Sequence, residues 1–144
     1  ESTYDIITLF HVLEHIHDLR KTCKRILKHL NSGGYLIIGV PNYESLDSKK
    51  YGNHWAGWDV PRHLYHFNSE AMENFKNEFE LELATTQAMK FDSYYVSLLS
   101  EGYINKSSSL ITKYFKAIWT GFKSNRSAIA NGQYSSNIYV FQKK

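Results

Sequence analysis

The sequence has little cysteine, little net charge and no long apolar run, and each shortage excludes a class of protein. Cys23 is the only cysteine among 144 residues, which excludes an internal disulfide and a cysteine-based zinc cluster. The formal net charge is only +3 and the lysines are dispersed, unlike the concentrated basic surface of nucleic-acid-binding proteins. No stretch approaches the roughly 20 apolar residues of a membrane span, and the first residues lack a signal peptide's basic and apolar regions. We therefore expect a cytoplasmic protein without nucleic-acid partners or an integral membrane segment.

The first third of the chain has the pattern of one βαβ unit. Tyr4–Phe10 is a short apolar run typical of a strand that is buried on both faces. Asp18 then starts a stretch with apolar residues at helical spacing, and Gly33 and Gly34 stop it. Residues 35–40 form a second apolar run, which predicts a parallel pair of strands with a right-handed crossover.

The rest of the chain predicts a mixture of helices, strands and two loops. Asn68 or Ser69 is expected to cap a helix that runs to Phe79. The other expected elements are a helix near 45–51, a loop to 67, a strand at 80–89, helices at 94–103 and 110–122, a loop at 123–135 and a strand at 136–142.

Two segments resemble a known family. YDIITLFHVLEHIHDLRKTCKRILKHLNSGGYLIIGVPN, residues 4–42, resembles the fourth strand, the following helix and the fifth strand of class I S-adenosylmethionine-dependent methyltransferases. WAGWDVPRHLYHF, residues 55–67, resembles a stretch of one bacterial branch of that superfamily. The resemblance implies an α/β fold with a partial Rossmann-like sheet in the order 4, 5, 7, 6, in which strand seven is antiparallel. Residues 94–122 would be a helical insertion between strands six and seven.

The resemblance implies S-adenosyl-L-methionine as cofactor and places its contacts at the end of the first strand. Ligands of open α/β sheets lie beyond the carboxyl ends of the strands. Cofactor contacts are therefore expected from Phe10, His11, Val12 and Leu13. Phe10 and Leu13 could instead be ordinary core residues.

An acceptor of the methyl group is expected beside this cofactor site. The segment 55–67 suits a lid, because it is rich in aromatic and paired polar residues. The expected acceptor-binding residues are Asn42, Trp55, Trp58, Arg62 and Tyr65. Arg62 could instead form an internal ion pair with Asp59 that fixes the loop.

His11 and His63 are the candidate catalytic residues, because an imidazole can take a proton near neutral pH. A purely structural histidine is the alternative for each. Ubiquinone-type O-methyltransferases hold a divalent metal in a similar Glu/Glu/His cluster. Here His11 replaces the first acid before Glu14 and His15, and we expect no metal.

The resemblance covers only part of a methyltransferase. The glycine-rich turn and the ribose-binding acid of the family have no counterpart here, so residues 1–144 are expected to be the C-terminal portion of one domain. The exposed sheet edge suggests either a homodimer that pairs through it or a missing half that was cut away. We expect the parent protein to methylate a small-molecule, sugar or lipid-like acceptor at oxygen, and the fragment to be inactive. The alternative is a non-catalytic Rossmann-like binding or interaction module.

The expected helix at 110–122 allows two interpretations. It combines an apolar face with Lys113, Lys116 and Lys123. Such a helix could lie on a membrane or cover a lipid-like acceptor. Packing against the sheet is the interpretation that the sequence favours.

Overall fold

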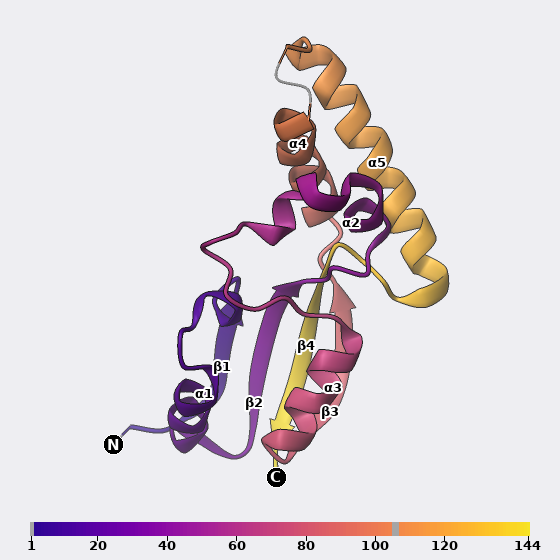
Figure 1. Cartoon of the computed structure of the whole chain (residues 1–144). Helices are drawn as coiled ribbons and strands as arrows, with labels where there is room; N and C mark the ends of the chain where they lie inside the picture. Colours follow the sequence, from indigo (N-terminus) through magenta and orange to yellow (C-terminus); the bar gives the residue numbers. More distant parts are fainter. Residues whose placement is uncertain (1, 105–106) are drawn as a thin grey trace.

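The computed structural model describes residues 2–104 and 107–144, and it contains a four-stranded mixed sheet in the order β1-β2-β4-β3 (Figure 1). The strands are β1 (Tyr4–Phe10), β2 (Leu30–Pro41), β3 (Leu81–Ala88) and β4 (Ser136–Lys143). β1 runs parallel to β2, whereas β4 runs antiparallel to both of its neighbours. The expected order, with an antiparallel last strand, is confirmed.

The βαβ unit forms as the sequence predicts. Helix α1 (Leu19–Lys28) begins where the Asp18 side chain accepts a hydrogen bond from the Lys21 amide. It crosses from β1 to β2, which pair so that Phe10 lies beside Gly39. β2 is longer than expected, because it begins at Leu30 and includes both glycines.

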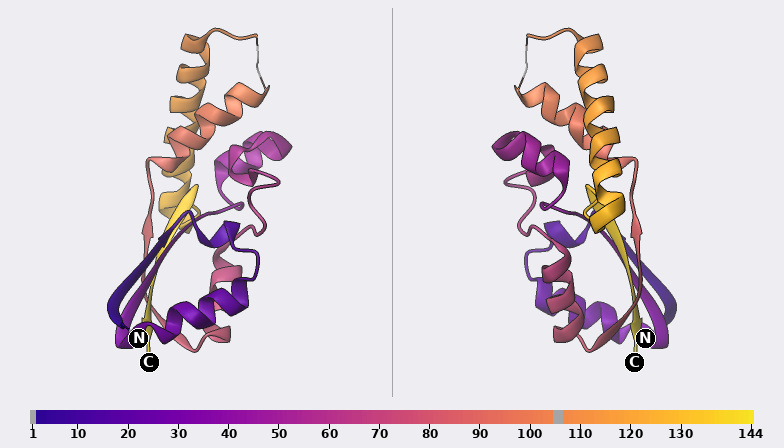
Figure 2. Two further views of the ribbon diagram at one scale, coloured as in Figure 1. Left: turned by 90° about the vertical axis from the view of Figure 1, so that its left-hand side faces the viewer. Right: turned by 90° about the vertical axis from the view of Figure 1, so that its right-hand side faces the viewer.

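Two helices cover one face of the sheet and bury the core. α3 (Ser69–Glu78) is capped by Asn68, as expected, and lies beside α1 on the same face (Figure 2). The fully buried core side chains between these helices and the sheet include Leu13, Cys23, Leu36, Ile38, Met72 and Phe141. Each such side chain stabilises the fold by about 1.5–3 kcal/mol through burial.

No described residue covers the opposite face of the sheet (Figure 2). Ile6, Phe10 and Tyr35 are large apolar or aromatic side chains on β1 and β2, and all three are exposed. β1 is also an edge strand that pairs only with β2 among the described residues. An apolar face and an open parallel edge together mark a surface that another polypeptide segment would cover.

A helical region stands on the carboxyl end of the parallel strands (Figure 1). It consists of α2 (Leu46–Tyr51), the 3-10 turns Gly52–His54 and Ala56–Trp58, α4 (Asp92–Ile104) and α5 (Leu110–Asn131). The described part of the chain includes no helix with the length and apolar character that crossing a membrane requires.

Two expectations for the helical region are wrong. The loop expected at 123–135 is helical up to Asn131, because Ser124 and Ala128 are small side chains that continue the buried face of α5. The helix ends at Gly132, which has a φ of 73°. α5 also packs against α4 and α2 instead of lying on the sheet (Figure 1).

A buried carboxyl group joins the helical region to the sheet. Asp47 accepts hydrogen bonds from Trp55 Nε1 at 2.8 Å, Ser124 Oγ at 2.6 Å and Ser135 Oγ at 2.7 Å. Asp47 lies in α2, and its partners lie in the following loop, in α5 and directly before β4. One side chain therefore holds together four segments that are distant in the sequence.

Candidate functional site

A cavity of about 550 Å³ lies at the carboxyl ends of β1 and β2, beneath the helical region. Its walls come from His11 after β1, Pro41 at the end of β2, residues 56–63 and one side of α4. This is the edge at which ligands bind in open α/β sheets. The cavity is therefore the candidate functional site.

His11 follows the last residue of β1 and lies between two carboxyl groups. Its Nε2 lies 3.2 Å from Asp92 Oδ2 and its Nδ1 lies 3.4 Å from Glu14 Oε1. The carboxyl groups of Asp92 and Glu14 raise the pKa of His11 from its ordinary 6.5 to about 10. His11 is an imidazolium at neutral pH, and its backbone holds a left-handed conformation with a φ of 50°.

Glu14 is the buried carboxyl group of this cluster. Its side chain is 1% exposed, and no described residue donates a well-aligned hydrogen bond to either carboxyl oxygen. The imidazole nitrogens of His11 and His63 lie 3.4 Å and 3.9 Å from Glu14 Oε1. A buried carboxyl group with so few donors depends on nearby positive charge, which the His11 imidazolium supplies.

His63 Nε2 faces Glu14, and His15 and His63 each hold the other ring nitrogen, Nδ1, against a carbonyl oxygen. His63 Nδ1 donates to the Gly57 carbonyl oxygen at 2.9 Å, and His15 Nδ1 donates to the Arg62 carbonyl oxygen at 3.0 Å. In a neutral His63 the proton is therefore on Nδ1, and the lone pair is on Nε2, which lies 3.9 Å from Glu14 Oε1 and 3.8 Å from Asp59 Oδ2. Burial lowers the pKa of His63 below its ordinary 6.5, so that this ring is neutral at pH 7.

Glu14, His15 and His63 form a group among the described residues that could hold a metal ion. One ligand atom from each lies within 4.8 Å of the others. Both histidines also donate their second ring nitrogen to a carbonyl oxygen, which is the usual support of a metal-binding histidine. A neutral base and a metal ligand require the same ring orientation, so experiment has to separate the two roles.

The residues expected to contact the cofactor divide into exposed and buried positions. Phe10 and Val12 are 44% and 41% exposed around His11, at the end of β1. Leu13 is fully buried in the core, which is the alternative that the sequence left open for it. The exposed strand end thus offers two apolar side chains and one cation to a ligand.

Of the residues expected to bind an acceptor, the structure places Arg62 at the cavity. Its guanidinium also pairs with Asp59 at 2.5 Å, so the internal ion pair is present as well. Trp58 is not among the lining residues, and its Nε1 donates to the Gly52 carbonyl oxygen at 2.8 Å.

The other three expected acceptor residues have structural partners away from the cavity. The Asn42 amide donates to Gln133 Oε1 at 2.7 Å and to the Tyr134 carbonyl oxygen at 3.0 Å. Trp55 is 2% exposed and bonded to Asp47. The contact of Trp55 with Asp47 fixes the start of the loop that forms the cavity wall, and the Asn42 contacts join the end of β2 to residues 133–134.

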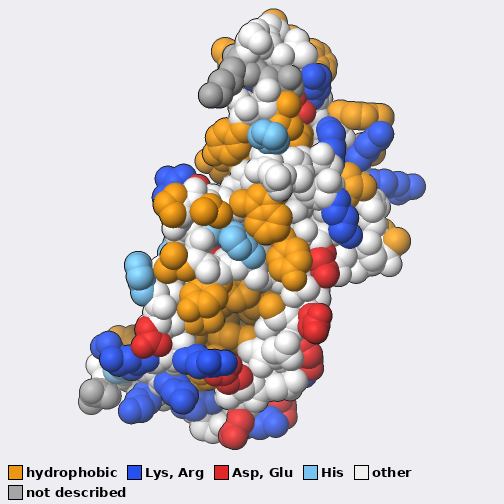
Figure 3. Space-filling model, viewed as in Figure 1, with side chains coloured by type: hydrophobic (Ala, Val, Ile, Leu, Met, Phe, Trp, Pro, Cys, Tyr) orange, Lys and Arg blue, Asp and Glu red, His pale blue; other side chains and the backbone are white. Residues whose placement is uncertain are grey.

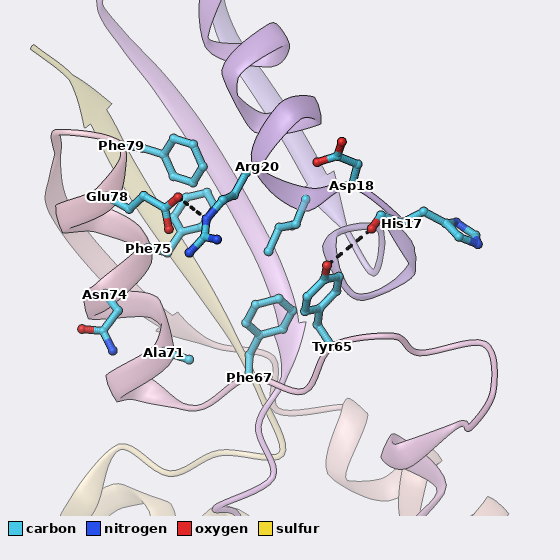
Figure 4. Close-up of a pocket in the computed structure, with 11 residues that line it drawn as sticks. His17, Asp18, Arg20, Tyr65, Phe67, Ala71, Asn74, Phe75, Glu78 and Phe79 are labelled. Carbon is cyan, nitrogen blue, oxygen red and sulfur yellow. Dashed lines mark hydrogen bonds and ion pairs between the residues drawn. The ribbon is translucent and has the colours of Figure 1, made fainter.

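Tyr65 lines a different groove, which lies between α1 and α3 (Figure 4). This groove has a volume of about 500 Å³, and Phe67, Phe75 and Phe79 lie around it. Arg20 Nε donates to Glu78 Oε1 at 2.6 Å across it. Because the groove lies beside the covered face of the sheet, Tyr65 does not reach the cavity at the strand ends.

Sequence reasoning missed the wall that α4 contributes. Asp92, Tyr95, Leu99 and Tyr103 line the cavity from this helix. The spacing of four between three of these positions indicates one helix face. His11 and this helix face are far apart in the sequence, however, and only the tertiary fold brings them together.

The ion pairs of His11 give the fold a definite pH dependence. A histidine whose pKa is raised on folding stabilises the protein fully below its ordinary pKa of 6.5, and this contribution disappears as the pH rises towards about 10. His11→Gln should therefore lower the urea midpoint at a pH below 6.5 and have a smaller effect near pH 10. His54→Gln, in an exposed turn, is the control. An equal destabilisation by His11→Gln at both pH values would contradict the assignment.

Comparison with known sequences identifies the family of this chain. The sequence matches the family described as "Methyltransferase domain" over residues 1–86, which is more than half of the chain. No curated protein matches the sequence.

Three solved structures with similar folds are longer than this chain. The cyclopropane synthase MmaA2 from Mycobacterium tuberculosis has a TM-score of 0.55 at 15% identity, with 99% of this chain and 56% of that chain covered. The cyclase SpnF has a TM-score of 0.56 at 13% identity, with 99% of this chain and 50% of that chain covered. Phosphoethanolamine N-methyltransferase 2 from Haemonchus contortus, in complex with phosphomonomethylethanolamine and S-adenosylhomocysteine, has a TM-score of 0.52 at 18% identity, with 97% of this chain and 33% of that chain covered.

These likenesses concern the fold, and the chain spans between 33% and 56% of the three proteins. The α/β sheet with its antiparallel last strand and the family match over residues 1–86 agree with each other. The chain therefore belongs to the methyltransferase domain family.

Proposed function

We propose that this chain forms the acceptor side of an S-adenosylmethionine-dependent methyltransferase that methylates a small-molecule, sugar or lipid-like acceptor at oxygen. The observation that carries the proposal is the cavity at the ends of β1 and β2, where a neutral His63 and a cationic His11 meet. The activity belongs to a longer cytoplasmic protein, and the 144 residues alone are inactive.

S-adenosyl-L-methionine, when bound, supplies an electrophilic methyl group. The residues at the end of β1 fit such a ligand, because Phe10 and Val12 are exposed apolar side chains on either side of His11. They would contact the methionine part, with Leu13 supporting them from the core. A segment that covers the bare sheet face and pairs with β1 would hold the rest, and a second copy at this edge is the homodimer alternative.

Methyl transfer to a hydroxyl group needs a positioned acceptor and a destination for its proton. With the donor bound, its methyl group would go to the acceptor oxygen, its thioether would be the leaving group, and His63 Nε2 would take the hydroxyl proton. Arg62 and the side chains of α4 orient the acceptor in the cavity. His11, whose two ring nitrogens face Asp92 and Glu14, places a positive charge at the cavity mouth.

Calorimetry with S-adenosyl-L-methionine tests whether cofactor binding needs the part of the protein outside these 144 residues. The full-length protein should bind the cofactor, Phe10→Glu should weaken that binding, and the 144-residue chain should give little heat. Equally tight binding by the 144-residue chain would contradict this requirement.

A radiolabelled methyl donor tests the reaction itself. The full-length protein is incubated with the donor and a panel of sugars, lipids and small phenols, and label is expected in one acceptor class. Cofactor binding without transfer to nucleophiles of any class would leave the non-catalytic binding module as the better description.

A further inference from the structure

α5 contacts the rest of the molecule through small side chains. Ala117, Gly121, Ser124 and Ala128 form its buried face. A Cβ added at Gly121 would lie 2.5 Å from Tyr94 Cδ1, which shows how closely α5 approaches α4. This narrow seam leaves the large side chains of the helix pointing elsewhere.

The outward face of α5 is a continuous apolar strip. Its members are 52–72% exposed and recur at intervals of three, four and seven residues. At about 100° per residue they occupy roughly a third of the helix circumference. The strip consists of Ile111, Phe115, Ile118, Trp119, Phe122 and Ile129.

Positive charge accompanies this strip, and α5 contains no acidic residue. The helix carries Lys113, Lys116, Lys123 and Arg126 and neither Asp nor Glu. Lys123 Nζ lies 5.0 Å from the centre of the Trp119 ring, so a cation borders the aromatic part of the strip. Lys and Arg side chains gather with hydrophobic ones along this edge of the molecule (Figure 3).

We propose that the outward face of α5 binds the surface of a membrane that contains anionic lipids. Large apolar side chains would enter the interface while the lysines remain at the level of the headgroups. The charges decide against a second copy of the same face, because a two-fold axis would bring like charges together. The same positive charges favour an anionic lipid surface. The apolar strip runs along the helix axis, which is the arrangement of a helix that lies in the plane of such a surface.

Vesicle sedimentation with the full-length protein tests the proposal. The protein should pellet with phosphatidylcholine vesicles that contain phosphatidylglycerol, and added salt should weaken the binding. A variant with Lys113→Glu, Lys116→Glu and Lys123→Glu should bind on the order of tenfold more weakly or worse. A second variant with Phe115→Ser and Phe122→Ser should lose binding similarly.

α1 offers a matched control of equal charge. Lys21→Glu, Lys24→Glu and Lys28→Glu change the same number of exposed or half-buried lysines on a helix without an exposed apolar strip. This variant should keep its binding to vesicles. Equal loss in the control, or unchanged binding by both α5 variants, would overturn the proposal.

Tryptophan fluorescence shows directly whether α5 contacts the lipid. Trp119 is exposed, whereas Trp55 is buried and Trp58 is half-buried. Brominated lipids should quench the wild-type emission, and Trp119→Phe should remove that quenching while the protein still pellets. Quenching that persists in Trp119→Phe would place a different surface on the lipid.

Sedimentation velocity tests the other possible occupant of the strip. A dimer that depends on Phe115 and Phe122 would refute the membrane assignment.

Discussion

Asp47→Ala is expected to destabilise the fold by about 3 kcal/mol or more. The substitution leaves the indole nitrogen of Trp55 and the hydroxyl groups of Ser124 and Ser135 without their acceptor. Each buried donor that loses its partner costs about 1–3 kcal/mol. Urea unfolding followed by circular dichroism would show a lower midpoint, and the α2–α5 region should lose amide protection first.

Two further variants define the effect. Ser124→Ala removes one of the three hydrogen bonds and should cost about 1 kcal/mol. Glu82→Ala removes a carboxyl group that is 65% exposed and only 3.8 Å from Lys144 Nζ, and it should change stability by less than about 0.5 kcal/mol. If Asp47→Ala behaved like Glu82→Ala, the three-bond junction would have no energetic importance.

His63→Gln is expected to lower kcat of the full-length protein by roughly 10²–10⁴-fold with little change in KM, because it removes the proposed general base. The ring nitrogen that would take the proton is Nε2, since Nδ1 is occupied by the Gly57 carbonyl oxygen. Burial lowers the pKa of His63, so the wild-type rate should fall only at a pH below 6.5. The variant should lose this acidic limb of the pH profile.

The metal-binding alternative gives a different result. If His63 acts as a base, dialysis against EDTA leaves kcat unchanged. If Glu14, His15 and His63 bind a metal, EDTA abolishes activity and a divalent ion restores it. His54→Gln is the matched histidine control and should retain wild-type kcat; a wild-type kcat in His63→Gln would exclude both roles.

Local sequence signals were sufficient for most of the fold. Tyr4–Phe10 has the bounds expected of the first strand, and Asp18 and Asn68 cap the helices that were expected to start there. These features depend on residues within a few positions of each other, so the sequence contains them directly.

The length of α5 could not be predicted in the same way. Ser and Asn between residues 123 and 131 favour loops locally, because their side chains compete for backbone hydrogen bonds. In the structure Ser124 donates to Asp47 and Asn125 donates to the Lys90 carbonyl oxygen, both distant in the sequence. Tertiary partners therefore overcome the local preference.

The sequence predicted only part of the candidate site. His11 and Arg62 were expected near the ligand, and both line the cavity. Trp55 was expected there because its loop is rich in aromatic and paired polar residues, and Asn42 because it follows the second strand. Their structural partners, Asp47 and Gln133, lie 8 and 91 positions away, and a single sequence carries no signal for such pairs.

The position of β4 has a consequence for how the chain folds during synthesis. Of the four described strands β4 is synthesised last, yet it lies between β2 and β3 and pairs with both of them. Until residues 136–143 emerge, β3 has no partner, and the βαβ unit alone must hide its apolar strands. Nascent chains that stall before Ser136 should consequently be substrates for chaperones, and deletion of residues 136–143 should unfold the described sheet.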